Sequence, residues 1–171
     1  MEVQTFASRF DASLVLGKKV AGYSPESHGA ALLLDDGTAL GLIAEEHSAG
    51  HWFEVFTLGI RTDAHERAWK LFPVPLSVEQ VTSLWRFEWL VEGASGPTLG
   101  GNPKTQYAGR GPIPAAALSA ARVEAGVVLK CASGNRVFAA ASATSPFAVG
   151  VAVDQREISK TLNDFLNTYE A

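Results

Sequence analysis

Apolar runs separated by glycine, proline and aspartate dominate the chain and indicate strands joined by tight turns. The clearest example covers residues 29–46, where two apolar runs flank Asp36 and Gly37. An Asp-Gly pair favours the positive φ angles of a two-residue hairpin turn. The pattern therefore predicts a β-hairpin with strands at 29–35 and 38–46.

A third strand is predicted at residues 51–61, which are rich in aromatic and β-branched side chains. The three residues 48–50 before it have the length and composition of a hairpin loop, with Gly50 in the left-handed position. Alternation gives both faces of this hairpin an apolar middle, so we expect each face to be covered. One face carries Ile43, Phe53 and Val55, and the other carries Leu40, Leu42, Trp52, Phe56, Leu58 and Ile60.

Residues 81–92 alternate with period two and predict a half-buried strand. Aromatic residues on such a strand are typical of core, so we expect the tryptophans to be buried. A rival interpretation is a helix beginning at Ser77, because residues 77–80 have the form of a capping box. One face of the strand carries Val81, Trp85, Phe87, Trp89 and Val91, and the other carries Arg86, Glu88 and Glu92.

Three further strands are predicted at 127–133, 136–144 and 147–153. This stretch aligns with the first three strands when Gly29 is matched to Gly126 and Gly37 to Gly134. The alignment suggests an internal repeat of one β-meander. The alternative is that any two apolar hairpins with a glycine turn align this well.

The C-terminal segment predicts a helix that begins after Asp154, with Glu157 completing a capping box. Residues 62–72 and the alanine-rich 114–126 are weaker helix candidates. The apolar side chains of the C-terminal helix recur at helical spacing, so one stripe should pack on the sheet. They are Ile158, Leu162, Phe165, Leu166 and Tyr169.

Together these elements predict one globular domain over residues 1–171 with an α+β fold. We expect a largely antiparallel sheet of about seven or eight strands, because the strands come in runs joined by tight turns. The C-terminal helix should pack on one face of this sheet. A true duplication would divide the domain into pseudo-repeat halves, 13–76 and 77–171, joined through a loop at 93–114.

Charge and composition narrow the classes of function. The formal net charge is −4 and the 14 basic residues are scattered, which argues against nucleic acid as a partner. The apolar surroundings of Cys131, the single cysteine, indicate a buried thiol. No apolar run reaches the roughly 18 residues that span a bilayer, and the first residues lack the features of a secretory signal. We therefore expect a cytoplasmic protein without membrane contact.

The stretch EEHSAGH brings His47 and His51 close together in sequence. Across a short hairpin loop two imidazoles can share a metal ion, but such a site normally needs three or four ligands. Glu45 and Glu46 are the nearest further candidates, and other histidines would have to be brought in by the fold. The alternative is a polar hairpin tip, because glycine and strand-like flanks argue against the helical form of this motif.

Residues 93–114 form a glycine- and proline-rich stretch that is unusually long for a connection inside one domain. Lys104, Tyr107 and Arg110 give it cationic and hydrogen-bonding groups, so they are the candidate binding residues. It is not a phosphate-binding loop, because Pro103 removes an amide from the position where that motif needs one. A partner-binding loop, a substrate lid and a linker are the alternatives.

No catalytic constellation is recognisable, since the chain lacks a nucleophile elbow and a complete set of metal ligands. The leading hypothesis is a small acidic cytoplasmic protein that binds another protein, as an inhibitor or immunity protein does, without a cofactor. The alternative is a ligand-binding protein or enzyme with a pocket between the sheet and the loop at 93–114. A homodimer through an edge strand is a further expectation.

Overall fold

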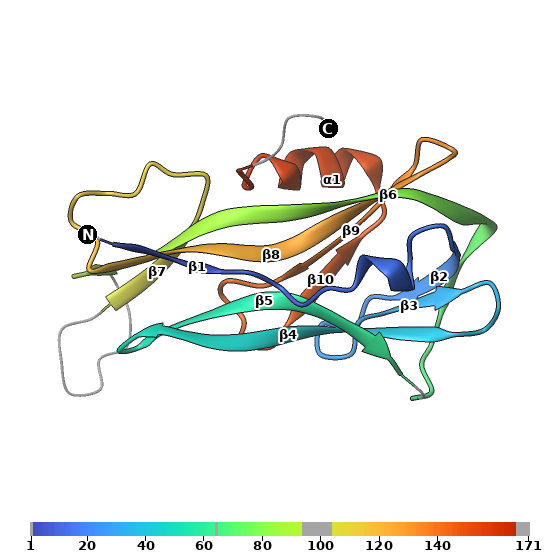
Figure 1. Cartoon of the computed structure of the whole chain (residues 1–171), viewed down its shortest axis with the longest axis horizontal. Helices are drawn as coiled ribbons and strands as arrows, with labels where there is room; N and C mark the ends of the chain where they lie inside the picture. The colour runs from blue at the N-terminus through green and yellow to red at the C-terminus, as the bar shows by residue number, and fades with distance from the viewer. Residues whose placement is uncertain (1, 64, 94–103, 167–171) are drawn as a thin grey trace.

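The computed structural model describes residues 2–63, 65–93 and 104–166 of the chain. This part contains one α-helix, α1 at Gln155–Leu162, which lies over an extensive sheet (Figure 1). A short 3-10 turn, η1, covers Ala12–Leu14. The strands are β1 (Val3–Phe6), β2 (Lys19–Ser24), β3 (Ala31–Leu34), β4 (Ala39–Gly50), β5 (Phe53–Thr62), β6 (Lys70–Glu92), β7 (Lys104–Gly109), β8 (Ser119–Cys131), β9 (Arg136–Ala141) and β10 (Val149–Ala152).

The sheet is mostly antiparallel, as predicted, and has the strand order β10-β9-β8-β6-β2-β3-β4-β5. Two further strands join it, because β7 pairs antiparallel with β6 and β1 pairs parallel with β8. The described residues thus form ten strands rather than the seven or eight expected. The three strands that the pattern missed are β1, β2 and β7. They are only four to six residues long, so their pairing with neighbouring strands is what makes them strands.

Strand β6 is 23 residues long and joins the two parts of the sheet. Its first residues pair with β2, and residues from Val78 onward pair with β8. The rival helix at Ser77 and the helix candidate at 62–72 are therefore wrong where the structure describes these residues. At Ser77, pairing with β2 and β8 decides in favour of the extended form, whereas the described residues among 63–69 lie in a connection that is neither helix nor strand.

The two strands of the hairpin predicted at residues 29–46 are confirmed, but its turn differs from the predicted two-residue form. Leu34 bonds to Thr38 around the three residues 35–37, and of these only Gly37 has a positive φ. Gly37 has a φ of 89°, and the backbone N–H of Thr38 donates to the Asp36 carboxylate over 2.8 Å. The loop at 48–50 differs from the prediction, because β4 continues to Gly50 through a bulge at Ala49. The turn that follows uses residues 51–52, with φ at Trp52 of 60°. The bulge preserves the predicted faces of the apolar residues that lie on the two strands, whereas Trp52 lies in the turn.

The alanine-rich segment is part of a strand, which corrects the helix expected at 114–126. Strand β8 begins at Ser119, and its Ala120, Ala121 and Val123 are buried between other elements. Alanine favours helices locally, but close packing against neighbouring strands also suits a small side chain, and here the tertiary context prevails. The pseudo-repeat stays a prediction, and its boundary after residue 76 lies inside β6.

Helix α1 is capped as predicted, since the Asp154 carboxylate accepts from the N–H groups of Arg156 and Glu157, each over 3.0 Å. It packs on β9 and ends at Leu162, earlier than the apolar spacing suggests. Phe165 beyond it is nevertheless buried. Tyr169 lies outside the described residues.

The interior consists of two apolar clusters. The first contains residues of β2 and β3, of the start of β4 and the end of β5, and of one side of β8 and β9. The second joins Phe53 and Val55 of β5 to β6, β8, β9 and α1. Both sides of the β4–β5 hairpin are covered in this way, as its two apolar faces predict. Among the residues described, no helix has the length and apolar character needed to cross a bilayer.

Candidate functional site

The buried and the exposed face of β6 are the opposite of those that its sequence pattern predicts. The side chains of Leu84, Arg86, Glu88 and Leu90 are buried, whereas the aromatic side chains at the positions between them are only half-buried. Two charged residues therefore point into the protein, and an aromatic stripe lies on the more exposed side. This arrangement needs polar partners in the interior, because an unpaired buried charge is strongly unfavourable.

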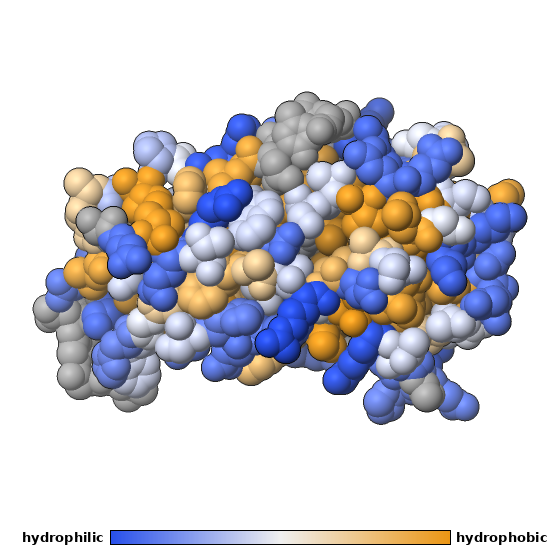
Figure 2. Space-filling model, in the orientation of Figure 1, coloured by the Kyte–Doolittle hydropathy of each residue, from blue (hydrophilic) through white to orange (hydrophobic). Residues whose placement is uncertain are grey.

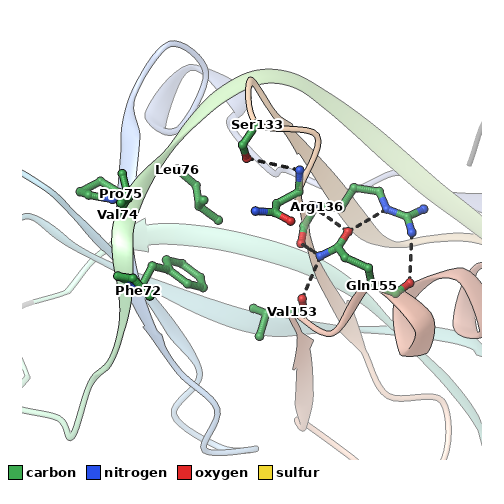
Figure 3. Close-up of a pocket in the computed structure, with 10 residues that line it drawn as sticks. Phe72, Val74, Pro75, Leu76, Ser133, Arg136, Val153 and Gln155 are labelled. Carbon is green, nitrogen blue, oxygen red and sulfur yellow. Dashed lines mark hydrogen bonds between the residues drawn. The ribbon is translucent and has the colours of Figure 1, made fainter.

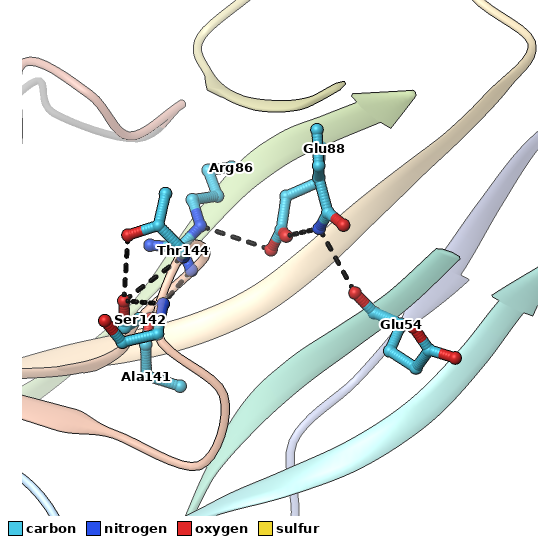
Figure 4. Close-up of polar contacts among 8 residues, drawn as sticks. Glu54, Arg86, Glu88, Ala141, Ser142 and Thr144 are labelled. Carbon is cyan, nitrogen blue, oxygen red and sulfur yellow. Dashed lines mark hydrogen bonds and ion pairs between the residues drawn. The ribbon is translucent and has the colours of Figure 1, made fainter. Parts of the chain in front are cut away.

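The partners come from three other elements (Figure 4). Arg86 Nε lies 3.3 Å from a carboxylate oxygen of Glu88, and its Nη2 donates to the carbonyl of Ala141 over 2.7 Å. The amide nitrogen of Gln106 donates to the other Glu88 oxygen over 2.7 Å and to the carbonyl of Glu54 over 3.1 Å. The ion pair thus ties β6 to β7 and β9, and Gln106 extends the link to β5.

Burial has the largest effect on the pKa of Glu88, whose side chain is 0% exposed. It raises the pKa of Glu88 above its ordinary value, while the charge of Arg86 and the bond from Gln106 act in the opposite direction. A carboxylate without solvent access cannot meet a substrate. Glu88 therefore has a structural role: it helps to hold β6 to its neighbouring strands behind the aromatic stripe.

The half-exposed side of β6 and β7 forms a surface that we call the aromatic face. It consists of Trp85, Phe87, Trp89, Val91 and Tyr107. Trp89 and Tyr107 are direct cross-strand partners, and their rings stack with centroids 6.2 Å apart. Tyr107 remains 45% exposed. Trp69, Trp85 and Trp89 are half-buried and Trp52 is 61% exposed, so the expectation of buried tryptophans is wrong for Trp52 and only partly met by the other three.

Neighbouring strands extend the aromatic face. The strand register places Tyr107, Trp89, Ala120 and Val3 in one row across β7, β6, β8 and β1. Arg122 on β8 lies over the ring of Trp85, 4.2 Å from its centroid, a cation–π contact. Figure 2 shows one group of hydrophobic residues at the left end of the molecule, the end where Figure 1 places β7, and a larger group right of centre.

The three residues predicted for the glycine-rich stretch occupy different surroundings. Lys104 is exposed at the start of β7, Tyr107 is part of the aromatic face, and Arg110 is exposed after the end of β7. The stretch at 93–114 is thus not a continuous loop, since 104–109 pair with β6. Residues 94–103 lie outside the described part.

A groove of about 610 Å³ lies where a pocket between the sheet and the 93–114 segment is expected. Its walls come from β4, β5, β7 and the β9–β10 connection. Both acidic and basic side chains line it, with Gln106 linking its wall to the buried Glu88. The lining residues are Glu46, Glu54, Phe56, Lys104, Thr105, Gln106, Ala143, Thr144 and Pro146.

The two predicted metal ligands have different environments. His47 lies beside Phe6, with centroids 5.3 Å apart, and its Nε2 is 2.9 Å from the hydroxyl of Thr57. His51 is exposed in the turn, with its ring edge-on to Trp52. The partners of His47 are thus the Phe6 ring and the Thr57 hydroxyl, and neither adds a further ligand to the predicted metal site.

The remaining histidines also have partners of their own. His28 Nδ1 is 3.1 Å from the hydroxyl of Ser27, and His65 Nδ1 is 2.6 Å from the carboxylate of Asp63. Bonds from the backbone and ring of His65 lower the pKa of Asp63 to about 2, and Arg67 pairs with the same carboxylate. Within the described ranges, no group of three or more His, Cys, Asp or Glu side chains could hold a metal ion.

Sequence reasoning selected Tyr107 but missed the groups around it. The signal available for the aromatic face was the period-two pattern of residues 81–92, which separates its aromatic and charged sides correctly but does not say which side is buried. Comparisons of the chain with protein families, with curated proteins and with solved structures found no match.

Proposed function

We propose that the chain is a small cytoplasmic, non-catalytic domain that binds another protein through the aromatic face. The observation that carries this proposal is the half-exposed aromatic stripe on β6 and β7, held from behind by the Arg86–Glu88 pair. Tyrosine, tryptophan and arginine are enriched at protein interfaces, because each gives a large contact area with a polar end.

The geometry suits a rigid docking surface. The stripe lies on paired strands, so little conformational entropy is lost when a partner orders it. Tyr107 and Trp89 support each other by stacking, and Arg122 is held over Trp85. An inhibitor or immunity role against a basic partner is the form of this proposal that the net charge of −4 favours.

We expect Tyr107→Glu to abolish partner binding, because it places a charge at the most exposed ring of the aromatic face. The native protein should recover one stoichiometric partner from cell extract, measured by quantitative mass spectrometry of affinity-purified complexes. The matched control is Leu71→Glu, which places the same charge at another exposed apolar side chain, 67% accessible and near the other end of β6. Recovery of no partner by the native protein, or full recovery by Tyr107→Glu, contradicts the proposal.

A second candidate function is binding of a small polar ligand in the groove between β5 and β7. The supporting observation is that Lys104, Thr105 and Gln106 line this groove together with Glu46 and Glu54. Groups of both charges on one concave surface can orient a polar ligand. This candidate includes an enzyme, in which case the groove would hold the substrate.

Thr105→Trp should fill the groove and remove ligand binding there. The measurement is a crystallographic screen of small polar fragments against the native protein and the variant. Ala108→Trp is the control, because Ala108 is exposed on the same strand and does not line the groove. Fragments that bind only outside the groove, or that bind equally to Thr105→Trp, would rule this function out.

A further inference from the structure

A different groove lies at the end of the molecule opposite β7, between β6 and the turn that joins β8 to β9 (Figure 3). Its volume is about 430 Å³, and one wall is almost wholly apolar. Phe72, Leu76 and Val153 also pack on the first core cluster, so the floor of the groove is continuous with the interior. A concave apolar surface with a few polar groups at one side is the usual form of a ligand site.

The apolar wall is an arch in β6 that its prolines produce. Between the pairs Val20–Leu76 and Gly22–Leu71, β2 contributes one residue and β6 contributes four, residues 72–75. Two of those four are prolines, which have no N–H to donate to β2 and so leave the ladder. The arch presents Val74 with 70% of its surface exposed.

The opposite side of the groove is mostly polar and contains one cation, Arg136, whose guanidinium extends past Gln155 toward a neighbouring hollow (Figure 3). Lys130 and Arg136 are direct cross-strand partners at the β8–β9 turn, and both line a second hollow of about 330 Å³. This hollow shares Arg136 and Gln155 with the apolar groove, so the two are contiguous. Like charges opposite each other destabilise a strand pair. Within the described residues, no carboxylate lies within 4.0 Å of either cation.

The guanidinium of Arg136 is fixed in place and keeps donors available. Its Nε donates to Gln155 Oε1 over 3.2 Å, and its Nη2 donates to the Gln155 carbonyl over 3.1 Å and to Ser159 Oγ over 2.7 Å. The two N–H groups of Nη1 have no hydrogen-bond partner in the described part of the chain. An oriented guanidinium with unused donors suits a carboxylate, which it can bind with charge-assisted hydrogen bonds.

We propose that this groove binds a monomeric anionic amphiphile, a single carboxylate on an unbranched alkyl chain. The carboxylate would lie between Lys130 and Arg136 and relieve the repulsion between them. The chain would lie along the arch and cover Val74. This site is separate from the aromatic face, so it does not depend on the proposed protein-binding function.

The test is an NMR titration of the native protein with decanoate below its micelle concentration. Decanoate should shift the amide signals of Phe72, Val74 and Leu76, and those of residues 133–136 and 153–159, in a saturable way. Decanol and decyltrimethylammonium, which have the same chain with a neutral or cationic head, should bind at least about tenfold more weakly there if head-group charge contributes as expected. Equal binding of all three, or no saturable shift at these residues, overturns the proposal.

Lys130→Glu tests the cationic end without disturbing the bonds that hold Arg136 to α1. The introduced carboxylate would pair with Arg136, which favours folding and competes with the ligand, so decanoate affinity should fall about tenfold or more. Lys104→Glu is the control, because it makes the same change on a distant strand, and it should leave the affinity unchanged. Equal effects of the two variants would mean that net charge alone governs binding, which overturns the assigned site.

Discussion

Arg86→Ala is expected to lower the free energy of unfolding by about 3–5 kcal/mol, because it leaves a buried carboxylate without its counter-charge. Arg86 is 8% exposed and Glu88 0% exposed, so water does not reach the site to replace the lost charge. The change also removes the bond from Nη2 to the Ala141 carbonyl. Urea unfolding followed by tryptophan fluorescence measures the effect.

The double variant Arg86→Met, Glu88→Leu is the control. It removes both charges and keeps similar apolar volume, so it should be much more stable than Arg86→Ala alone. Gln106 would still donate to the Glu54 carbonyl. If the single and the double variants unfold at the same urea concentration, loss of packing rather than the unpaired charge is responsible, and the role assigned to this ion pair is wrong.

The destabilisation by Arg86→Ala should also grow as the pH rises. Arg86 is the main group that opposes the effect of burial on the Glu88 pKa, so its removal raises that pKa further. A carboxyl with a raised pKa binds more protons in the folded state than in the unfolded state. Its contribution is therefore most favourable below the pKa of the unfolded chain and is lost as the pH rises through the folded pKa. Urea unfolding at several pH values between about 4 and 8 measures this trend.

The same ion pair shows why the sequence predicts the strands of this protein better than its surface. Asp36–Gly37 and Gly134 mark their turns by local chemistry, and both hairpins form where expected. In contrast, Arg86 is satisfied by Ala141, 55 residues away, and Glu88 by Gln106, 18 residues away. No local pattern reveals such partners, so the charged face of residues 81–92 was predicted to be outside.

The candidate site, like the fold, could be predicted from the sequence only in part. Tyr107 could be selected because its glycine- and proline-rich context is unusual, but its stacking partner Trp89 depends on the pairing of β7 with β6. The groove beside Arg136 depends on prolines in β6 lying near the β8–β9 turn, and these segments are about 60 residues apart in the chain. Sites made by pairing of distant strands need the fold before they can be seen.

Phe53→Ala is expected to lower the free energy of unfolding by about 3–5 kcal/mol, comparable to the loss of the buried charge. Phe53 is 0% exposed and is the large side chain with which the tip of the β4–β5 hairpin enters the second core cluster. Truncation removes apolar burial and leaves a cavity that Ala121 and Val123 of β8 are too small to fill. The effect is measured by urea unfolding, with hydrogen exchange of residues 44–57 as a local probe.

Trp52→Ala provides a matched control for this variant, because it removes a larger ring from the adjacent position. Trp52 is 61% exposed in the turn, so its loss should change stability by no more than about 0.5 kcal/mol. The contrast separates burial from aromatic character. Since Glu54, next to Phe53, accepts the bond from Gln106, faster exchange in Phe53→Ala should extend to β7. Similar stabilities of the two variants would show that the hairpin tip is not anchored on β8, and the rigid support proposed for the aromatic face would fail with it.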